Sequence, residues 1–199
     1  DPALSASQNA QRYFNKYHKL THAIKHIETQ LRKASEENEY LDSVETQIQL
    51  SDPQDLEEIR EELRSAGYLR SKQANKKQKK NKASKPYHFR SSDGTDIRVG
   101  KNNIQNDNLT MKQARNNHIW LHAKDIPGSH VIVESTEPSE QTLLEAAIIA
   151  AYYSKYQQSA NVPVDYVEVK HVKKPNGAKP GFVIYTNQKT LSVTPNKEL

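Results

Sequence analysis

Two stretches in the last third of the chain decide how its globular part folds. They are Asn117-His-Ile-Trp-Leu-His-Ala-Lys-Asp-Ile-Pro-Gly-Ser-His-Val131 and Lys173-Lys-Pro-Asn-Gly-Ala-Lys-Pro-Gly-Phe-Val-Ile-Tyr-Thr186. Each joins a short apolar run, typical of a β-strand, to a loop of Lys, Pro, Gly and small polar residues. Such loops are stiff and present backbone N–H groups beside ammonium charge. That chemistry suits a phosphate backbone better than a small-molecule reaction.

The residues after 85 predict an α+β domain. Apolar runs bounded by turn residues indicate strands over 87–90, 96–99, 119–123, 130–133, 166–172, 182–185 and 190–193. Polar and apolar residues alternate along 119–123, which places Trp120 and His122 on a solvent-facing side. Helices are expected over 108–116 and over 139–156, the latter with Ser139 as N-cap. Its inward side chains are expected to be Leu143, Leu144, Ala147, Ile148 and Ala151. This order of elements predicts a mainly antiparallel sheet with two helices over residues 86–199.

Residues 1–70 predict a helical arm. Apolar residues recur every three or four positions from Tyr13 to Leu31, which is the spacing of a coiled-coil seam. A long helix is therefore expected over about 5–49, and a second over about 53–66, with Asp52-Pro53 as its start and Gly67 as its stop. The second helix is too short to cover the first. The seam therefore needs either a preceding antiparallel helix or a second copy of the chain.

The net charge of +5 is unevenly distributed along the 199 residues. Residues 71–85 contain seven Lys and no acid, and their largest apolar residue is Ala, so we expect a disordered linker. This linker either tethers RNA phosphates or acts as a solubilising hinge. The arm is acidic, above all over 36–62, where eleven acids accompany a single Arg. Acidic charge favours a basic protein surface as the target of the arm.

The two long stretches supply the candidate nucleic-acid contacts. These are Trp120, His122, Lys124, Lys173, Lys174 and Lys179. The residues expected to shape the loops are Asp125, Pro127, Gly128, Gly177, Pro180 and Gly181. Trp120 is either a platform on which bases stack or a core residue packed against a neighbouring strand. The three lysines of the second stretch either contact phosphate or lie on a solvated hairpin loop.

Catalytic, metal-binding and cofactor-binding interpretations are disfavoured. His118, His122 and His130 fall on strands, where residues four apart lie roughly 13 Å from each other, too far to share one ion. The i, i+4 histidines at 18, 22 and 26 are expected on a solvated helix face. Ser129 has no base paired to it by spacing, so no enzyme is expected. The chain has no Cys and no apolar run of membrane-spanning length, and its start at Asp1 suggests an excised fragment.

The same two stretches carry a family resemblance. HIWLHAKDIPGSHVIVE and VKKPNGAKPGFVIYTNQKTLSVTP resemble the carboxy-terminal RNA-binding (NFACT-R) domain of the fibronectin-binding-protein-A-like, RqcH/NEMF family. DPALSASQNAQRYFNKYHKL and DLEEIREELRSAGYL resemble the end of that family's middle coiled coil. Matching motif residues are Trp120, His122, Lys124, Asp125, Pro127, Gly128, Ser129, His130, Lys173, Lys174, Pro175, Gly177, Lys179, Pro180 and Gly181. His118 stands where relatives are expected to carry Asp.

The resemblance implies an RNA- and ribosome-binding module of a ribosome-quality-control factor. Full-length members are expected to bind the large subunit with a stalled peptidyl-tRNA and to recruit tRNA for carboxy-terminal tailing of the nascent chain. The implied partners are tRNA, large-subunit rRNA and a ribosomal protein, in the cytoplasm. The alternative is a bacterial surface adhesin that binds fibronectin or fibrinogen without a signal peptide. The residues that grip tRNA in the family are expected in an amino-terminal domain outside this chain, so the resemblance does not assign tail addition to this chain alone.

Overall fold

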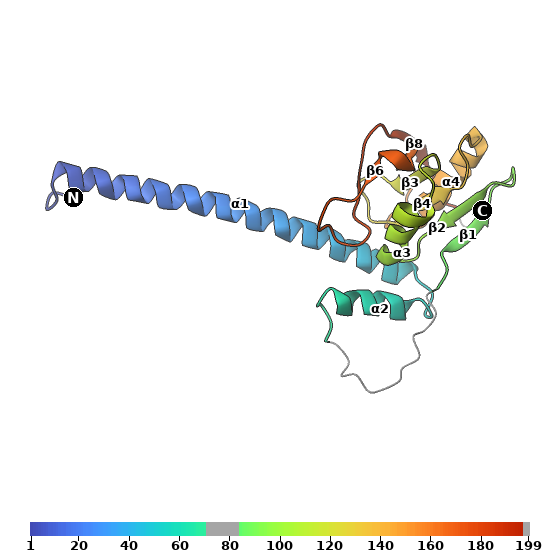
Figure 1. Cartoon of the computed structure of the whole chain (residues 1–199), viewed down its shortest axis with the longest axis horizontal. Coiled ribbons are helices and arrows are strands. Elements are labelled where there is room, and N and C mark those ends of the chain that lie inside the picture. Colours follow the sequence, from blue (N-terminus) through green and yellow to red (C-terminus); the bar gives the residue numbers. More distant parts are fainter. Residues whose placement is uncertain (71–83, 197–199) are drawn as a thin grey trace. The chain divides into compact units, whose positions relative to one another are not determined.

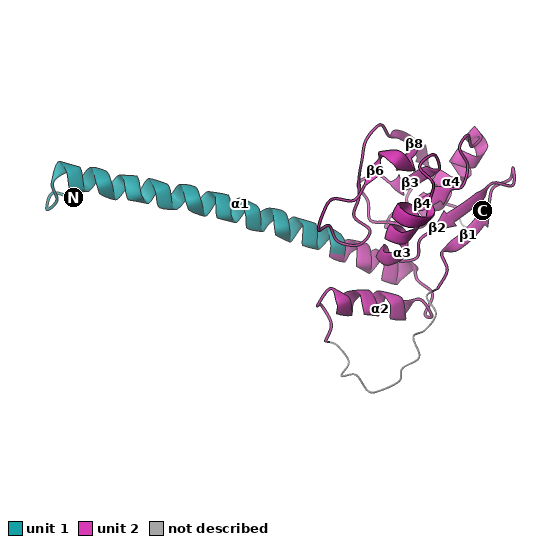
Figure 2. Ribbon diagram, in the orientation of Figure 1, with its two compact units in different colours: residues 1–40 teal, residues 41–199 magenta. Residues whose placement is uncertain are grey.

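The computed structural model describes residues 1–70 and 84–196 and divides the chain into two compact units, residues 1–40 and 41–199 (Figure 2). Nearly all of the expected linker over 71–85 lies outside the described residues. The division between the units falls inside the first helix and not at the Lys-rich segment. The second unit therefore contains more than the domain expected over 86–199.

Helix α1 (Ala6–Leu50) agrees with the helix expected over about 5–49 (Figure 1). Its start is a capping box, in which the Ser5 hydroxyl accepts from the Gln8 N–H at 3.2 Å and the Gln8 side chain accepts from the Ser5 N–H at 2.8 Å. Its 45 residues contain neither Gly nor Pro, so no turn is interrupted. The seam residues from Tyr13 to Leu31 are more than half exposed. A coiled coil needs a helix against that seam and stays a prediction.

The second unit is built on a six-stranded sheet. Its strand order is β1-β2-β4-β3-β5-β8, with every neighbouring pair antiparallel. The strands are β1 (Tyr87–Arg90), β2 (Asp96–Val99), β3 (Ile119–Ala123), β4 (Val131–Val133), β5 (Val162–Glu168) and β8 (Lys189–Val193). A separate antiparallel ribbon pairs β6 (Val172–Lys173) with β7 (Ile184–Tyr185). The predicted α+β class and mainly antiparallel sheet are confirmed.

One face of the sheet packs against α4 (Glu140–Tyr152). Ser139 caps this helix as expected, with its hydroxyl accepting from the Thr142 N–H at 3.1 Å. Four alanines of α4 are completely buried, which lets the helix approach the strands closely: Ala146, Ala147, Ala150 and Ala151. The expectation that Leu144 faces inward was wrong, because this side chain is 41% exposed.

The opposite face is covered by α3 (Asn103–Asn108), the π-helical turn η1 (Leu109–Gln113) and the β6–β7 ribbon. The helix expected over 108–116 was therefore placed too late. Helix α3 starts directly after its N-cap Asn102, whose side chain accepts from the Gln105 N–H at 2.8 Å. The strand expected over 166–172 was also misplaced, because β5 begins at Val162 and a 3₁₀ turn (Val169–His171) separates it from β6.

Helix α2 (Leu56–Ser65) begins later than expected. Asp55, not Asp52, stands at the N-cap position, and its carboxylate accepts from Lys101 Nζ at 2.9 Å instead of capping the helix. The predicted stop at Gly67 is confirmed, because its φ of 85° allows the Tyr68 N–H to reach the Leu63 carbonyl at 2.9 Å.

Buried polar bonds fix α2 and the end of α1 to the start of α3. Gln47 exchanges two bonds with Asn103, at 2.6 and 3.1 Å. Glu58 accepts from the Asn102 side chain at 2.8 Å. Asn103 also donates to Glu62 at 3.2 Å. Residues 41–65 thus belong structurally to the globular unit.

Candidate nucleic-acid interface

Trp120 lies in the core and not on a wet face of the sheet. Its side chain is 0% exposed, and the expectation of a solvent-facing side on β3 was wrong. The indole stacks on His122 at 5.6 Å between ring centroids and lies 4.7 Å from the Tyr185 ring. Because these rings cover it, Trp120 offers no open face to a base. The burial supports the core alternative for this residue.

His130 joins the two long sequence motifs. Its Nε2 lies 3.1 Å from the Gly181 carbonyl oxygen, and its Nδ1 lies 2.8 Å from the Thr110 hydroxyl. Since a carbonyl oxygen only accepts, Nε2 carries the proton and Nδ1 accepts from Thr110. Burial is the main cause that lowers the pKa of His130, and the neighbouring His122 lowers it further, to about 3. The imidazole is therefore neutral at physiological pH, with one tautomer fixed.

Asp107 holds the same loop from its other side. Its Oδ1 accepts from the Gly181 N–H at 3.0 Å, and its Oδ2 pairs with Lys174 Nζ. Both backbone groups of Gly181 are thus bonded, the N–H to Asp107 and the carbonyl to His130. We call this arrangement of Asp107, His130 and Gly181 the loop clamp. It fixes the end of the Lys-rich loop over residues 173–181.

Tight turns shape that loop. Gly177 and Gly181 have φ of 77° and 79°, in the left-handed region that favours glycine. The Ala178 N–H donates to the Pro175 carbonyl at 3.1 Å, and the Phe182 N–H donates to the Lys179 carbonyl at 3.2 Å. A Cβ at Gly181 would lie 2.4 Å from Asn103 Oδ1, so close packing as well as φ requires glycine there.

The three lysines of the loop differ in their surroundings. Lys173 is exposed on β6. Lys174 is 29% exposed and bound to Asp107. Lys179 Nζ lies 3.3 Å from the Tyr68 hydroxyl and 5.1 Å from the centre of its ring. The loop therefore presents one exposed ammonium group and two half-buried ones.

The first motif's loop packs against the chain that follows α4. Ser129 N–H donates to the Tyr153 carbonyl at 2.9 Å, and Lys155 N–H donates to the Pro127 carbonyl at 2.8 Å. A Cβ at Gly128 would lie 3.1 Å from both Ser154 Cβ and the Tyr153 carbonyl, so this glycine permits a close approach. These backbone groups are thus bonded within the protein, whereas the sequence suggested that the loop would offer its N–H groups to phosphate.

Lys124 and Asp125 stand apart from the loop clamp. The Lys124 N–H extends the sheet ladder by donating to the Pro163 carbonyl at 2.8 Å. Asp125 has a φ of 52° and so shapes the turn through its backbone. No contact places Lys124 beside the lysines of the second loop within residues 1–70 and 84–196. Its phosphate role stays a prediction.

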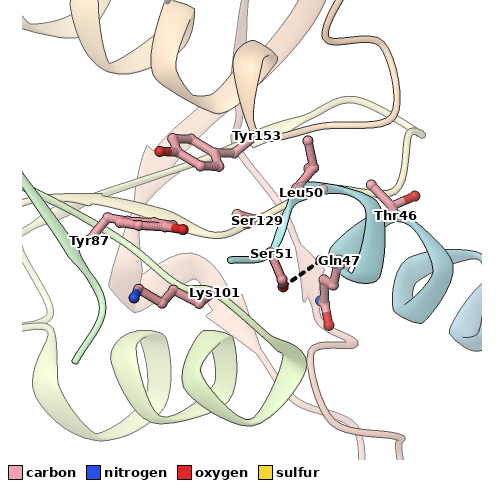
Figure 3. Close-up of a pocket in the computed structure, with 9 residues that line it drawn as sticks. Thr46, Gln47, Leu50, Ser51, Tyr87, Lys101, Ser129 and Tyr153 are labelled. Carbon is pink, nitrogen blue, oxygen red and sulfur yellow. Dashed lines mark hydrogen bonds between the residues drawn. The ribbon is translucent and has the colours of Figure 1, made fainter. Parts of the chain in front are cut away.

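A small pocket lies elsewhere in the second unit (Figure 3). It is lined by Thr46, Gln47, Leu50, Ser51, Tyr87, Lys101, Gly128, Ser129 and Tyr153. Burial raises the pKa of Tyr153 to about 12, and it also raises the pKa of Tyr87. Both phenols therefore stay protonated at neutral pH. In the described part of the chain, no three His, Asp or Glu side chains gather to hold a metal ion.

Two family descriptions cover nearly the whole chain. Residues 1–82 match the NFACT N-terminal and middle domains, and residues 85–187 match the NFACT protein RNA binding domain. The chain belongs to the NFACT family. This confirms the resemblance carried by the two long motifs. Among the helices of residues 1–70 and 84–196, none combines the length and apolar character that a membrane crossing requires.

Several NFACT-family relatives resemble the chain closely. It is 52% identical to the Rqc2 homolog RqcH of Bacillus subtilis (strain 168) and 47% identical to that of Streptococcus suis (strain 05ZYH33). The 200 aligned residues take in all of this chain but only 35% and 36% of those two proteins. The solved C-terminal part of the fibronectin/fibrinogen-binding protein from Streptococcus suis matches with a TM-score of 0.91 and 47% identity. That match covers 98% of this chain and 78% of the solved one.

Local sequence patterns did not predict the residues that hold the Lys-rich loop over 173–181 in place. Asp107 lies 67 residues before Lys174 in the chain, so no local pattern links the two. Asn103 is likewise joined to Gln47 across 56 residues. The Asn102 cap was the one available signal, since Asn is a preferred N-cap residue. It would have placed α3 correctly and brought Asp107 onto a helix.

Proposed function

We propose that this chain is an RNA- and ribosome-binding module of a ribosome-quality-control factor. The loop clamp is the observation that carries the proposal. It fixes a loop that bears Lys173, Lys174 and Lys179, so little conformational entropy is lost when the loop meets a phosphate backbone. The match of residues 85–187 to an RNA binding domain supports the same function.

The proposed RNA partners are tRNA and large-subunit rRNA. Lysines on a stiff loop contact phosphates in either RNA, since the phosphate backbone carries no sequence information. The relatives named RqcH are about three times as long as this chain, and tail addition on a stalled peptidyl-tRNA is proposed for proteins of that full length. In this proposal the module works in the cytoplasm, where ribosomes are.

The helical arm is proposed to contact protein. The exposed seam of α1 from Tyr13 to Leu31 suits a second helix, either from an upstream segment or from another copy of the chain. Of the acids over 36–62, Asp55 and Glu62 are buried, and the exposed acids of α1 favour a basic ribosomal protein surface over RNA: Glu36, Glu37, Glu39, Asp42 and Glu45. A fragment that carries the arm alone is therefore not expected to compete for tRNA.

Filter binding of tRNA to the full chain at low and near-physiological salt tests the proposal. Lys173→Glu leaves the loop clamp untouched and is expected to weaken binding several-fold. Lys173→Glu combined with Lys174→Glu and Lys179→Glu is expected to abolish it. The matched control for the single variant is Lys25→Glu, an equal charge change on an exposed lysine of α1. Equal losses in control and loop variants, or unchanged affinity in the triple variant, would refute the phosphate role of the loop.

Adhesion to fibronectin or fibrinogen is the second candidate function. It is suggested by the fold shared with the solved C-terminal part of a fibronectin/fibrinogen-binding protein. Titrating fibronectin beside tRNA in the same assay separates the two functions. Salt-insensitive fibronectin binding at micromolar levels, lost on deletion of residues 1–40, would support adhesion through α1 and argue against the RNA proposal.

A further inference from the structure

The outer face of the β6–β7 ribbon combines an aromatic ring, an aliphatic side chain and an ammonium group. Lys173 and Ile184 are register partners in the antiparallel pair, so their side chains point to the same side. Phe182 lies just before β7, and the burial of residues 182–185 alternates: Val183 and Tyr185 pack against the core cluster, whereas Phe182 and Ile184 are exposed. Phe182 therefore lies on the exposed side together with Ile184. We call this surface of Lys173, Phe182 and Ile184 the ribbon face.

The inner side of the same ribbon packs against the sheet. Val172 and Tyr185, the other register pair, belong to the core cluster around Trp120. Val183 packs against that cluster too. The ribbon therefore packs on the sheet through its inner side. Its outer side chains remain exposed, Phe182 by 41% and Ile184 by 52%.

We propose that the ribbon face binds an unpaired nucleotide of the RNA, with Phe182 stacking on the base and Lys173 contacting a neighbouring phosphate. This inference rests on the proposed RNA-binding function and names the RNA element that is bound. Antiparallel pairing puts the Cα atoms of Ile184 and Lys173 about 5 Å apart, and the chain allows at most about 7 Å between those of Phe182 and Ile184. One short stretch of RNA can therefore contact all three residues.

An unpaired nucleotide fits this surface better than a double helix does. Bases within an A-form helix are stacked on one another, and only loops, bulges and ends expose a base for an aromatic side chain. Stacking on aromatic residues is tolerant of sequence, so the ribbon face selects an accessible base and not a particular one. Trp120, the aromatic residue that the sequence favoured for stacking, is closed off by His122 and Tyr185.

Charge favours RNA over an apolar protein surface as the occupant. Lys173 stands beside the two apolar side chains and has no acidic partner among the described residues. The nearby acids are already engaged, Asp107 by Lys174 and Glu168 by Lys170. The ribbon is also held in place by the loop clamp, which includes Gly181, next to Phe182. The backbone positions that carry the aromatic ring and the ammonium group are therefore fixed relative to each other.

Binding of two labelled RNAs to the full chain tests the inference: a single-stranded 12-nucleotide oligoadenylate, and a blunt, fully paired RNA duplex of the same length. Phe182→Ala is expected to weaken oligoadenylate binding about five- to hundredfold, the usual effect of removing one stacking residue. Duplex binding should stay within about twofold. Phe182→Trp should retain oligoadenylate binding, and its new indole fluorescence should be quenched by the oligonucleotide. Leu144→Ala is the matched control, since Leu144 is equally exposed but lies on α4.

The outcomes separate this inference from the proposed function. If the wild type binds both RNAs and Phe182→Ala leaves both unchanged, the ribbon face is not a stacking site, whereas RNA binding by the loop stands. The stacking role is equally overturned if Phe182→Ala weakens binding of both RNAs to the same extent. If the wild type binds neither RNA at low salt, the proposed function and this inference both fail.

Discussion

The imidazole of His130 donates from Nε2 to the carbonyl oxygen of Gly181 at 3.1 Å. This bond joins the two sequence motifs that are conspicuous in the chain, 51 residues apart. Asp107 accepts from the N–H of the same glycine, so Gly181 is held on both sides. The position of the lysine loop therefore depends on a histidine that burial keeps neutral.

Stability should fall with acidification below pH 6.5. His130 has a pKa of about 3 in the folded state, against 6.5 for an ordinary His. The unfolded chain therefore binds a proton that the folded chain refuses, and stability that is complete above pH 6.5 is lost progressively towards pH 3. Burial lowers the pKa of His122 as well, which adds to the slope. Each such proton contributes about 1.4 kcal/mol per pH unit to the free energy of unfolding.

Urea unfolding of His130→Gln between pH 7.5 and 4.5 measures this contribution. The variant is expected to be less stable at neutral pH and to show a shallower pH slope, by about one proton. His26→Gln on α1 is the control and should keep the wild-type slope. A slope in His130→Gln as steep as that of the wild type would show that the folded state does not exclude a proton from His130.

Gly177→Ala and Gly181→Ala form a matched pair. Both glycines have φ near 80°, so each substitution introduces backbone strain of about 1–2 kcal/mol. A Cβ at Gly177 meets nothing within 4 Å, whereas one at Gly181 lies 2.4 Å from Asn103 Oδ1. Gly181→Ala should therefore be clearly more destabilising in urea unfolding and should weaken tRNA binding more. Equal losses of stability in the two variants would contradict the close packing of Gly181 on Asn103.

Local patterns predicted the parts of this fold that local contacts decide. The stop at Gly67, the cap at Ser139 and the hairpin over 87–99 all depend on residues a few positions apart. Local patterns could not predict whether either side of β3 faces solvent. Trp120 and His122 alternate with apolar residues as on a wet strand, but α3, η1 and the distant β6–β7 ribbon cover that face.

The candidate site, too, could be predicted from the sequence only in part. Gly177 and Gly181 were predicted as loop-shaping residues, and their positive φ values supply a reason. The ion pair of Lys174 with Asp107 and the contact of Lys179 with Tyr68 could not be predicted, because 67 and 111 residues separate the partners. Sequence patterns identified a charged loop, whereas tertiary contacts decide which of its lysines are exposed.

Lys101→Met should loosen the attachment of α2. Asp55 is 2% exposed and pairs with Lys101 at 2.9 Å. Removing one partner of a buried pair leaves an uncompensated charge and costs about 3–5 kcal/mol. The double variant Lys101→Met with Asp55→Asn should recover part of that loss, as measured by urea unfolding. A cost below about 1 kcal/mol for Lys101→Met alone would mean that the pair does not hold α2 in place.

RNA binding should not change the fluorescence of Trp120. It is the one Trp of the chain, so intrinsic indole fluorescence reports on this residue alone. Because the side chain is fully buried, acrylamide should quench it weakly in the native protein and strongly in urea. Saturating tRNA should leave the emission of the folded chain unchanged. Strong quenching by tRNA would indicate that the indole becomes accessible and stacks on a base.

The salt dependence of tRNA binding tests the role of the lysine loop most directly. The slope of log affinity against log salt is to be compared between the wild type and the variant Lys173→Gln, Lys174→Gln, Lys179→Gln. The slope is expected to become shallower by about 0.7–0.9 for each lysine that contacts a phosphate. A loss of at least one such step, in a variant that still unfolds cooperatively on heating, is the predicted result. Parallel lines for the two proteins would contradict the account.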